Sequence, residues 1–215
     1  MSPTLLDGVH AGAMLSFNLQ PSRWLHSSRW PLFLPPGWAA PVPAEAARHR
    51  HLSALVLAQL GQAATPVNDT TCPEWPLALA PTALLRRLVL HLALVLLQRR
   101  MRHAIAREEV RAISMVLDDE LLAFARERAA TLGSAHDSFD HQPLNQLLPR
   151  LEDIGSGTLW LACAEAPIPL QARLRLRTVD TQWQPRGDPG TALAMVLRVL
   201  DHLEPTWTSS FPRRR

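Results

Sequence analysis

The residues best suited to chemistry are the histidines and carboxylates of one polar stretch. His136, Asp137, Asp140 and His141 lie close together in the sequence. Imidazole and carboxylate groups are common ligands of divalent metals, so this cluster could bind a cation. No second set of ligands with the spacing of a zinc site accompanies it, and a solvated polar loop is the interpretation that the sequence favours.

Motifs of catalysis and nucleotide binding are missing from the sequence. It contains no H-E-x-x-H, no Walker A sequence, no G-x-G-x-x-G and no G-x-S-x-G. Gly155-Ser156-Gly157 predicts a turn before a helix and is too short to hold a phosphate. Neighbouring acids such as Glu108-Glu109 and Glu152-Asp153 diverge on a helix. We therefore expect a protein that is not an enzyme and that uses no metal and no cofactor.

Arginine supplies the whole positive charge of the chain, which has no lysine and no tyrosine. The net charge of +3 equals the contribution of the terminal Arg213–Arg215, so the rest is formally neutral. A neutral body argues against a nucleic-acid groove. Two local clusters remain, which are solvated faces by default and otherwise docking patches for an acidic partner surface. They are Arg99, Arg100 and Arg102, and Arg173, Arg175 and Arg177.

Cysteine usage and hydropathy predict a soluble cytoplasmic protein. Cys72 and Cys163 lie far apart without metal or redox spacing, which favours two buried thiols in a reducing compartment. The N-terminus lacks the pattern of a secretory signal. The most apolar run, 88–97, is about half of the ~20 residues that span a bilayer, so we expect no direct membrane insertion.

Hydrophobic periodicity predicts a mainly α fold. The Pro- and Trp-rich stretch 17–43 is expected to form an irregular packed arm with a short helical turn at 22–27. Alternation of arginine and leucine at 172–178 predicts a short strand, so at most a minor β element near 171–179. Helices are expected over 43–62, 82–105, 107–132 as one helix or two, 143–154 with a break at Pro149, 158–165 and 189–204.

The chain is long enough for one domain with a substantial core. We expect a flexible N-terminal lead over 1–14, a single helical domain over 15–204 and a basic C-terminal tail over 205–215. No internal repeat of solenoid length is present.

An ordered set of motifs resembles the SctK family (the YscK/PscK group) of type III secretion systems. The first is F-N-L-Q-P-S-R-W-L-H at 17–26, with an aromatic lead, a proline and then aromatic-Leu-His. It is followed by the leucine-rich helix 84–97 with its basic continuation, by G-T-L-W-L-A at 157–162, by the Arg-Leu alternation and by a last amphipathic helix. The matching residues are Phe17, Pro21, Trp24, Leu25, His26 and Trp160, with Trp24 where the family often has tyrosine.

The resemblance implies a non-enzymatic, mostly helical adaptor of the injectisome sorting platform. Such an adaptor links the forkhead-associated-like cytoplasmic domain of the inner-membrane ring protein SctD to the pod protein SctQ, and through it to SctL and the ATPase SctN. It is cytoplasmic, is recruited to the cytoplasmic face of the inner membrane at the injectisome base, and is needed for platform assembly and effector secretion. Two alternatives remain from the residues themselves: an Arg-rich helical nucleic-acid-binding or regulatory module, and a metal enzyme or hydrolase using the 136–141 loop.

Overall fold

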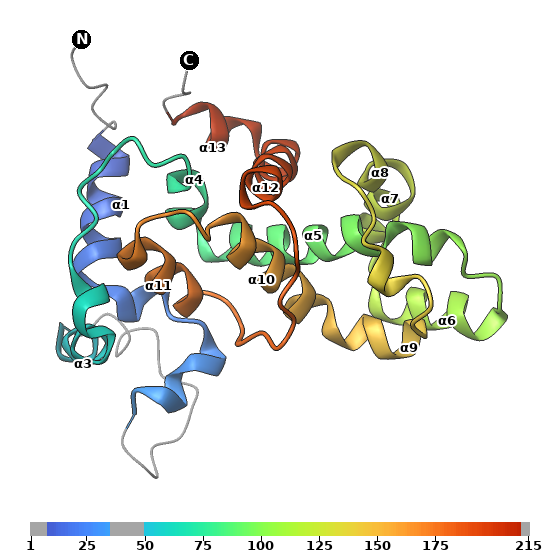
Figure 1. Cartoon of the computed structure of the whole chain (residues 1–215), viewed down its shortest axis with the longest axis horizontal. Helices are drawn as coiled ribbons and strands as arrows, with labels where there is room; N and C mark the ends of the chain where they lie inside the picture. The colour runs from blue at the N-terminus through green and yellow to red at the C-terminus, as the bar shows by residue number, and fades with distance from the viewer. Residues whose placement is uncertain (1–7, 35–49, 212–215) are drawn as a thin grey trace. The chain divides into compact units, whose positions relative to one another are not determined.

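The computed structural model describes residues 8–34 and 50–211, and these residues are mainly helical (Figure 1). The prediction of a mainly α fold is confirmed. Within the described ranges every regular element is an α-helix or a 3₁₀-helix. Contacts group the chain into two compact units, unit 1 (Met1–Thr82, Cys163–Asp180 and Glu204–Arg215) and unit 2 (Ala83–Ala162 and Thr181–Leu203).

Short elements dominate unit 1, because prolines repeatedly restrict the backbone. Pro21 begins one 3₁₀-helix and Pro31 lies inside the next, which agrees with the irregular arm expected from the sequence as far as residue 34. Two aromatic rings form a centre of the core, where Phe17 meets Trp75 edge to face with ring centroids 5.8 Å apart. The elements are α1 (Gly8–Leu19), η1 (Pro21–Trp24), η2 (Ser27–Leu32), α3 (Arg50–Leu60), η3 (Gly61–Ala64), α4 (Trp75–Ala78), α11 (Ile168–Leu176) and α13 (Pro205–Ser209).

Helical structure extends further toward both termini than the sequence suggested. The flexible lead expected over 1–14 is wrong for residues 8–14, which belong to α1. The tail expected over 205–215 is wrong for 205–211, because Trp207 and Phe211 have i,i+4 spacing and pack around His10. The indole of Trp207 also donates to the carbonyl of Pro76 at 2.9 Å. Residues 1–7 and 212–215 lie outside the described part of the chain.

The predicted strand near 171–179 is wrong, because most of that segment belongs to the helix α11. Pro167 and Pro169 favour a helix start there, since a proline ring pre-sets the backbone angle of a first turn. Leu170 and Leu174, four residues apart, are both buried on one side of the helix. The same spacing joins Arg173 to Arg177, whereas a strand would have placed Arg173, Arg175 and Arg177 together on one face.

Unit 2 is arranged around α5 (Thr82–Arg102), whose middle is apolar on every side and buried, as the sequence predicted. No helix in the described residues is both long and apolar enough to cross a membrane.

The expected helix over 107–132 divides into three, and Asp118 begins the second of them by accepting from the backbone N–H of Leu121 at 2.9 Å, which caps α7. The other elements are α6 (Arg107–Val116), α7 (Asp119–Glu127), α8 (Ala129–Leu132), η4 (Asp137–Phe139), α9 (Leu144–Leu147), η5 (Leu148–Arg150), α10 (Leu151–Ala162) and α12 (Pro189–Leu203).

Gly155 lets α10 approach α5 closely. A Cβ at this position would lie 1.9 Å from the carbonyl oxygen of Val89, so any larger side chain would force the helices apart. A Cβ on Gly157 would similarly lie 2.4 Å from the carbonyl oxygen of Trp183. The turn expected at Gly155-Ser156-Gly157 is therefore wrong. Both glycines lie inside α10, where they serve close backbone packing.

Candidate functional site

The N-terminal motif residues pack within unit 1, where two of them are buried and three are half-buried. Phe17 is buried, and Pro21 opens η1 directly after α1. The indole ring of Trp24 lies beneath the guanidinium of Arg177, 4.6 Å from the ring centroid. The backbone N–H of His26 donates to the carbonyl of Leu176 at 2.8 Å, and its side chain caps η2. Leu25, between the last two, is half-buried, so the motif acts by packing and capping.

Trp160, the remaining motif residue, lies elsewhere. It belongs to α10 of unit 2, where its side chain is half-buried. The structure therefore assigns the N-terminal motif and the Trp160 motif to different units.

Arg173 is directed into unit 1 and binds backbone carbonyls. Only 2% of the residue is exposed, although it carries a charge. Its two terminal nitrogens donate to carbonyls on three separate segments, most of them at the C-terminal end of η3. The acceptors are Ala63 at 2.9 Å, Ala64 at 2.5 Å, Thr65 at 3.2 Å, Pro169 at 3.1 Å and Asn18 at 3.4 Å.

Arg177 is buried in the same way one helical turn later. It donates to the carbonyls of Ala78 and Ala80, at the C-terminal end of α4. Burial lowers the pKa of its guanidinium to about 9, which leaves the group charged at neutral pH. Carbonyl oxygens and the face of Trp24 supply the electron density that stabilises this charge.

Arg29 repeats the pattern from the N-terminal arm. It donates to the carbonyls of Arg175, Thr178 and Val179, at the C-terminal end of α11, and forms an ion pair with Asp180 at 2.9 Å. Helix C-termini leave carbonyls without partners inside the helix and carry partial negative charge. Each buried arginine named here thus caps a helix that lies far away in the sequence.

The docking patch predicted at 173–177 is consequently wrong for two of its three members. Arg173 and Arg177 are structural, since their terminal nitrogens donate to carbonyls inside unit 1. Arg175 is exposed on the opposite side of α11. Arginine on its own does not indicate a binding surface here, because its five N–H donors suit carbonyl clusters as well as carboxylates.

The second cluster lies at the end of α5 in unit 2 and is partly neutralised. Arg99 forms ion pairs with Asp137 and Asp140, and this pairing lowers the pKa of the Asp140 carboxyl. Arg100 pairs with Glu109 and donates to the carbonyl of Gln142 at 2.9 Å.

The polar loop at 136–141, which could in principle bind a cation, uses its polar groups in internal interactions. Asp137 and Asp140 bind Arg99, and the ring of His136 accepts from the backbone N–H of Ser138 at 3.3 Å and caps η4. Across residues 8–34 and 50–211, no group of three or more His, Cys, Asp or Glu side chains is placed to hold a metal. Cys72 and Cys163 are both buried and are not linked by a disulfide, and burial raises the pKa of the Cys163 thiol.

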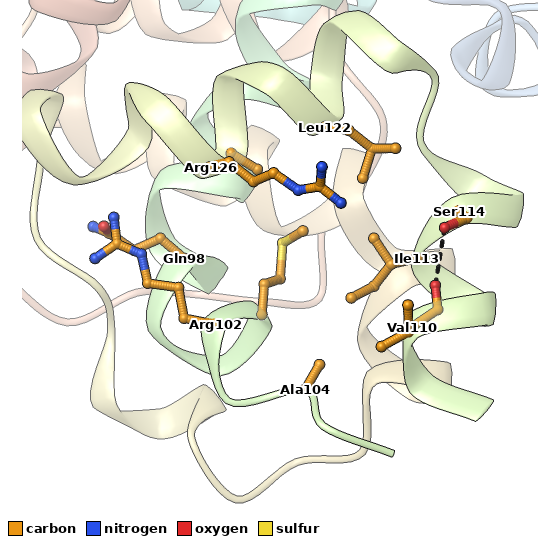
Figure 2. Close-up of a pocket in the computed structure, with 10 residues that line it drawn as sticks. Gln98, Arg102, Ala104, Val110, Ile113, Ser114, Leu122 and Arg126 are labelled. Carbon is orange, nitrogen blue, oxygen red and sulfur yellow. Dashed lines mark hydrogen bonds between the residues drawn. The ribbon is translucent and has the colours of Figure 1, made fainter. Parts of the chain in front are cut away.

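A small apolar cavity opens where α5, α6 and α7 of unit 2 converge (Figure 2). Its volume is about 240 Å³. Its lining includes apolar side chains from all three helices and two arginines, and it includes no carboxylate. The ten residues are Gln98, Met101, Arg102, Ala104, Val110, Ile113, Ser114, Leu122, Ala125 and Arg126. We call this cavity the α6 groove.

The two uncharged polar side chains of the α6 groove are already hydrogen-bonded. Gln98 donates to the carbonyl of Gly133 at 2.9 Å, and the hydroxyl of Ser114 donates to the carbonyl of Val110 at 3.1 Å. Figure 2 shows the Ser114–Val110 bond on one side of the cavity, with Arg102 on the other. Neither Arg102 nor Arg126 has an ion pair with a carboxylate of the described residues, and both are exposed. The groove therefore combines an apolar lining with two exposed arginines that have no ion pair among the described residues.

Sequence reasoning found only part of this site. Arg102 was a candidate docking residue, and Val110 and Ile113 fall within the helical stretch expected over 107–132. The contribution of Arg126 was missed, because it depends on the fold that brings α7 beside the end of α5. One signal was present in the sequence: Ile105 and Val110 are apolar in an otherwise charged stretch, and they are 88% and 46% exposed.

A second cavity of about 350 Å³ lies in unit 2 between the 133–136 segment, Trp183 and the start of α12. It is lined by a mixture of charged and apolar groups that includes Arg186, Arg198 and Asp188. The Asp188 carboxylate already accepts from the backbone N–H of Thr191 at 2.6 Å and so caps α12. The Asp188 carboxylate therefore has a structural role, and the α6 groove is the stronger candidate for a binding site.

No protein-family model, curated protein or solved structure is significantly similar to this chain. The class that the fold and the site define is a helical protein with a small apolar groove rimmed by arginine. A function for it has to be argued from its own residues and contacts.

Proposed function

We propose that this protein is a non-enzymatic adaptor of the type III secretion sorting platform. It links the forkhead-associated-like cytoplasmic domain of SctD to the pod protein SctQ, and acts on the cytoplasmic face of the inner membrane at the injectisome base. The ordered resemblance to the SctK family, extending over most of 15–204, is the basis of this proposal.

The observation that supports it most is a set of contacts between two distant parts of that resemblance. The N-terminal motif contains Trp24 and His26, and the Arg-Leu segment contains Leu176 and Arg177. In unit 1 these segments meet directly, through the His26–Leu176 hydrogen bond and the stacking of Arg177 on Trp24. Segments whose side chains depend on each other are expected to persist together in a family, which is how an ordered motif set arises.

The organisation of the chain also suits an adaptor. Each unit has its own buried apolar centre, around Phe17 and Trp75 in unit 1 and around α5 in unit 2. An adaptor must present at least two surfaces to two proteins, and two independently packed bodies provide them. The α6 groove is one such surface, on unit 2.

The test is reconstitution with the SctD cytoplasmic domain and the SctQ protein of the source organism. We expect stoichiometric co-purification of the full-length chain with each partner at low salt, and a ternary complex when both are present. Deletion of the gene should abolish platform assembly and effector secretion, and the wild-type gene should restore both. Binding to neither partner at low salt would overturn the proposal.

The nucleic-acid alternative loses its main argument when the arginines are located. Arg173 and Arg177 are buried, so two of the six clustered arginines cannot face a phosphate backbone, and Arg99 and Arg100 are already paired with carboxylates. Phosphate contacts make affinity fall steeply with salt. We therefore expect no salt-dependent binding of a mixed-sequence DNA or RNA in an anisotropy titration.

A further inference from the structure

The α6 groove has the features of a site for protein side chains. Small-molecule and cofactor sites usually enclose about 300–1,000 Å³, and this groove, at about 240 Å³, is smaller. Its hydroxyl and amide groups bond to the protein's own backbone, which leaves few directed polar groups to orient a small ligand. An apolar pocket of this size fits one or two anchor side chains of a partner.

The surroundings of the groove extend the apolar surface. Val110 lines the groove and is 46% exposed, and Ile105, which follows the lining residue Ala104, is 88% exposed. Met101 supplies a flexible thioether that adapts to different side chains. A cleft with apolar groups along its length accepts the apolar face of an amphipathic helix.

Charge distinguishes this groove from the rest of the α5 terminus. Arg99 and Arg100 are paired with carboxylates, but Arg102 and Arg126, at the groove, have no such pair among the described residues. Helical spacing of i, i+3 and i+7 adds Arg107 to the side of α6 that carries Val110 and Ser114. Positive groups therefore line the groove from α5 and α7, and no carboxylate lines it.

We propose that the α6 groove binds an acidic amphipathic helix of a partner protein. Apolar residues of that helix enter the cavity beside Val110 and Leu122, and flanking glutamates or aspartates pair with Arg102 and Arg126. This inference stands on the groove alone and does not depend on which assembly the protein serves. The reconstitution with SctD and SctQ can fail while this site is present, and the reverse also holds.

A pair of labelled synthetic helices tests the proposal with the full-length protein. Both carry leucine at i, i+3, i+4 and i+7 on an alanine background; one has glutamate on the flanking positions and the other has lysine. We expect fluorescence anisotropy to show binding of the acidic helix roughly tenfold tighter than the basic one at low salt, because the rim is positive. The R102E/R126E variant should reverse this preference. Equal affinity of the two helices, or binding of neither, would overturn the proposal.

A matched pair of tryptophan variants locates the binding. Ala104→Trp fills the groove from its lining, whereas Ala123→Trp places the same side chain on an exposed position of α7 outside it. We expect Ala104→Trp to weaken binding of the acidic helix by roughly tenfold or more and Ala123→Trp to leave it unchanged. Circular dichroism must show wild-type helicity for all variants, and loss of helix binding in both tryptophan variants alike would contradict the location. A concentration-dependent dimer that Ala104→Trp alone abolishes would assign the groove to a second copy of the chain and overturn the proposal.

Discussion

The two units use the same residue type in opposite ways. In unit 1, Arg29, Arg173 and Arg177 point inward and cap the C-terminal ends of distant helices. In unit 2, Arg99 and Arg100 stay at the end of α5, where they bind carboxylates of neighbouring segments. Unit 1 is made of short helices with many exposed ends, so carbonyls that need donors are abundant there. Unit 2 is built around one long apolar helix, whose carbonyls bond within the helix except in its last turn.

The difference shows that an arginine cluster in a sequence has no single meaning. Inside a protein, a guanidinium is stable when several carbonyl oxygens accept its hydrogen bonds. At the protein surface, carboxylates or water molecules accept them instead. Short helices create the first situation. A long helix that ends at the surface creates the second.

Removal of a buried arginine should have the largest effect. Arg177→Met keeps most of the side-chain volume and leaves the carbonyls of Ala78 and Ala80 without a donor. Unsatisfied buried groups cost about 1–3 kcal/mol each, so we expect a loss of about 3 kcal/mol in unfolding free energy. Urea denaturation followed by tryptophan fluorescence measures it. Arg175→Met, on the exposed side of the same helix, is the control and should cost less than about 1 kcal/mol. Equal losses in the two variants would contradict the inward role of Arg177.

The next largest effect should come from close packing in unit 2. Gly155→Ala places a methyl group 1.9 Å from the backbone oxygen of Val89, which only a shift of α10 against α5 can relieve. Overpacking of this kind costs about 1–3 kcal/mol, and the backbone contact places it toward the upper end. Gly12→Ala provides the contrast, since no atom lies within 4 Å of the added group and α1 should gain about 0.5–1 kcal/mol. Denaturation midpoints of the two variants must therefore move in opposite directions.

A smaller effect is expected from pH, because unit 2 buries an imidazole and not a guanidinium. His91 donates from Nδ1 to the carbonyl of Arg87 at 2.7 Å and meets the ring of Phe124, and burial lowers its pKa below 6.5. The unfolded chain therefore takes up a proton at a higher pH than the folded chain. The contribution to stability is complete above pH 6.5 and falls as the pH drops through the lowered pKa. In His91→Asn the thermal midpoint should decline less between pH 7 and pH 5 than in the wild type, and parallel declines would refute this assignment.

The smallest effect should come from the surface pairs of Arg99. Exposed ion pairs contribute little, since water screens them and both side chains lose freedom. We expect Arg99→Gln to lower the thermal midpoint slightly at low salt and not measurably at about 1 M salt, where the screening length is about 3 Å. Arg102→Gln, on the same helix without an ion pair to the described residues, should show no such salt dependence. A salt-independent loss in Arg99→Gln would show that this arginine has a buried role like that of Arg177.

The sequence by itself determined the helical class, the apolar centre α5, the breaks at prolines and the last helix α12, because these depend on periodicity and local backbone restriction. It did not determine α11, where alternating arginine and leucine imitates a strand although Arg173 and Arg177 share a helical face. Only the tertiary structure decided which arginines are internal, since the carbonyls that bind them belong to residues 63–65 and 78–80, about a hundred positions away. The α6 groove is likewise a product of folding, because it needs α7 beside the end of α5. Local preferences act within a few residues, whereas a site for a charged or apolar group depends on segments that meet only after the chain has folded.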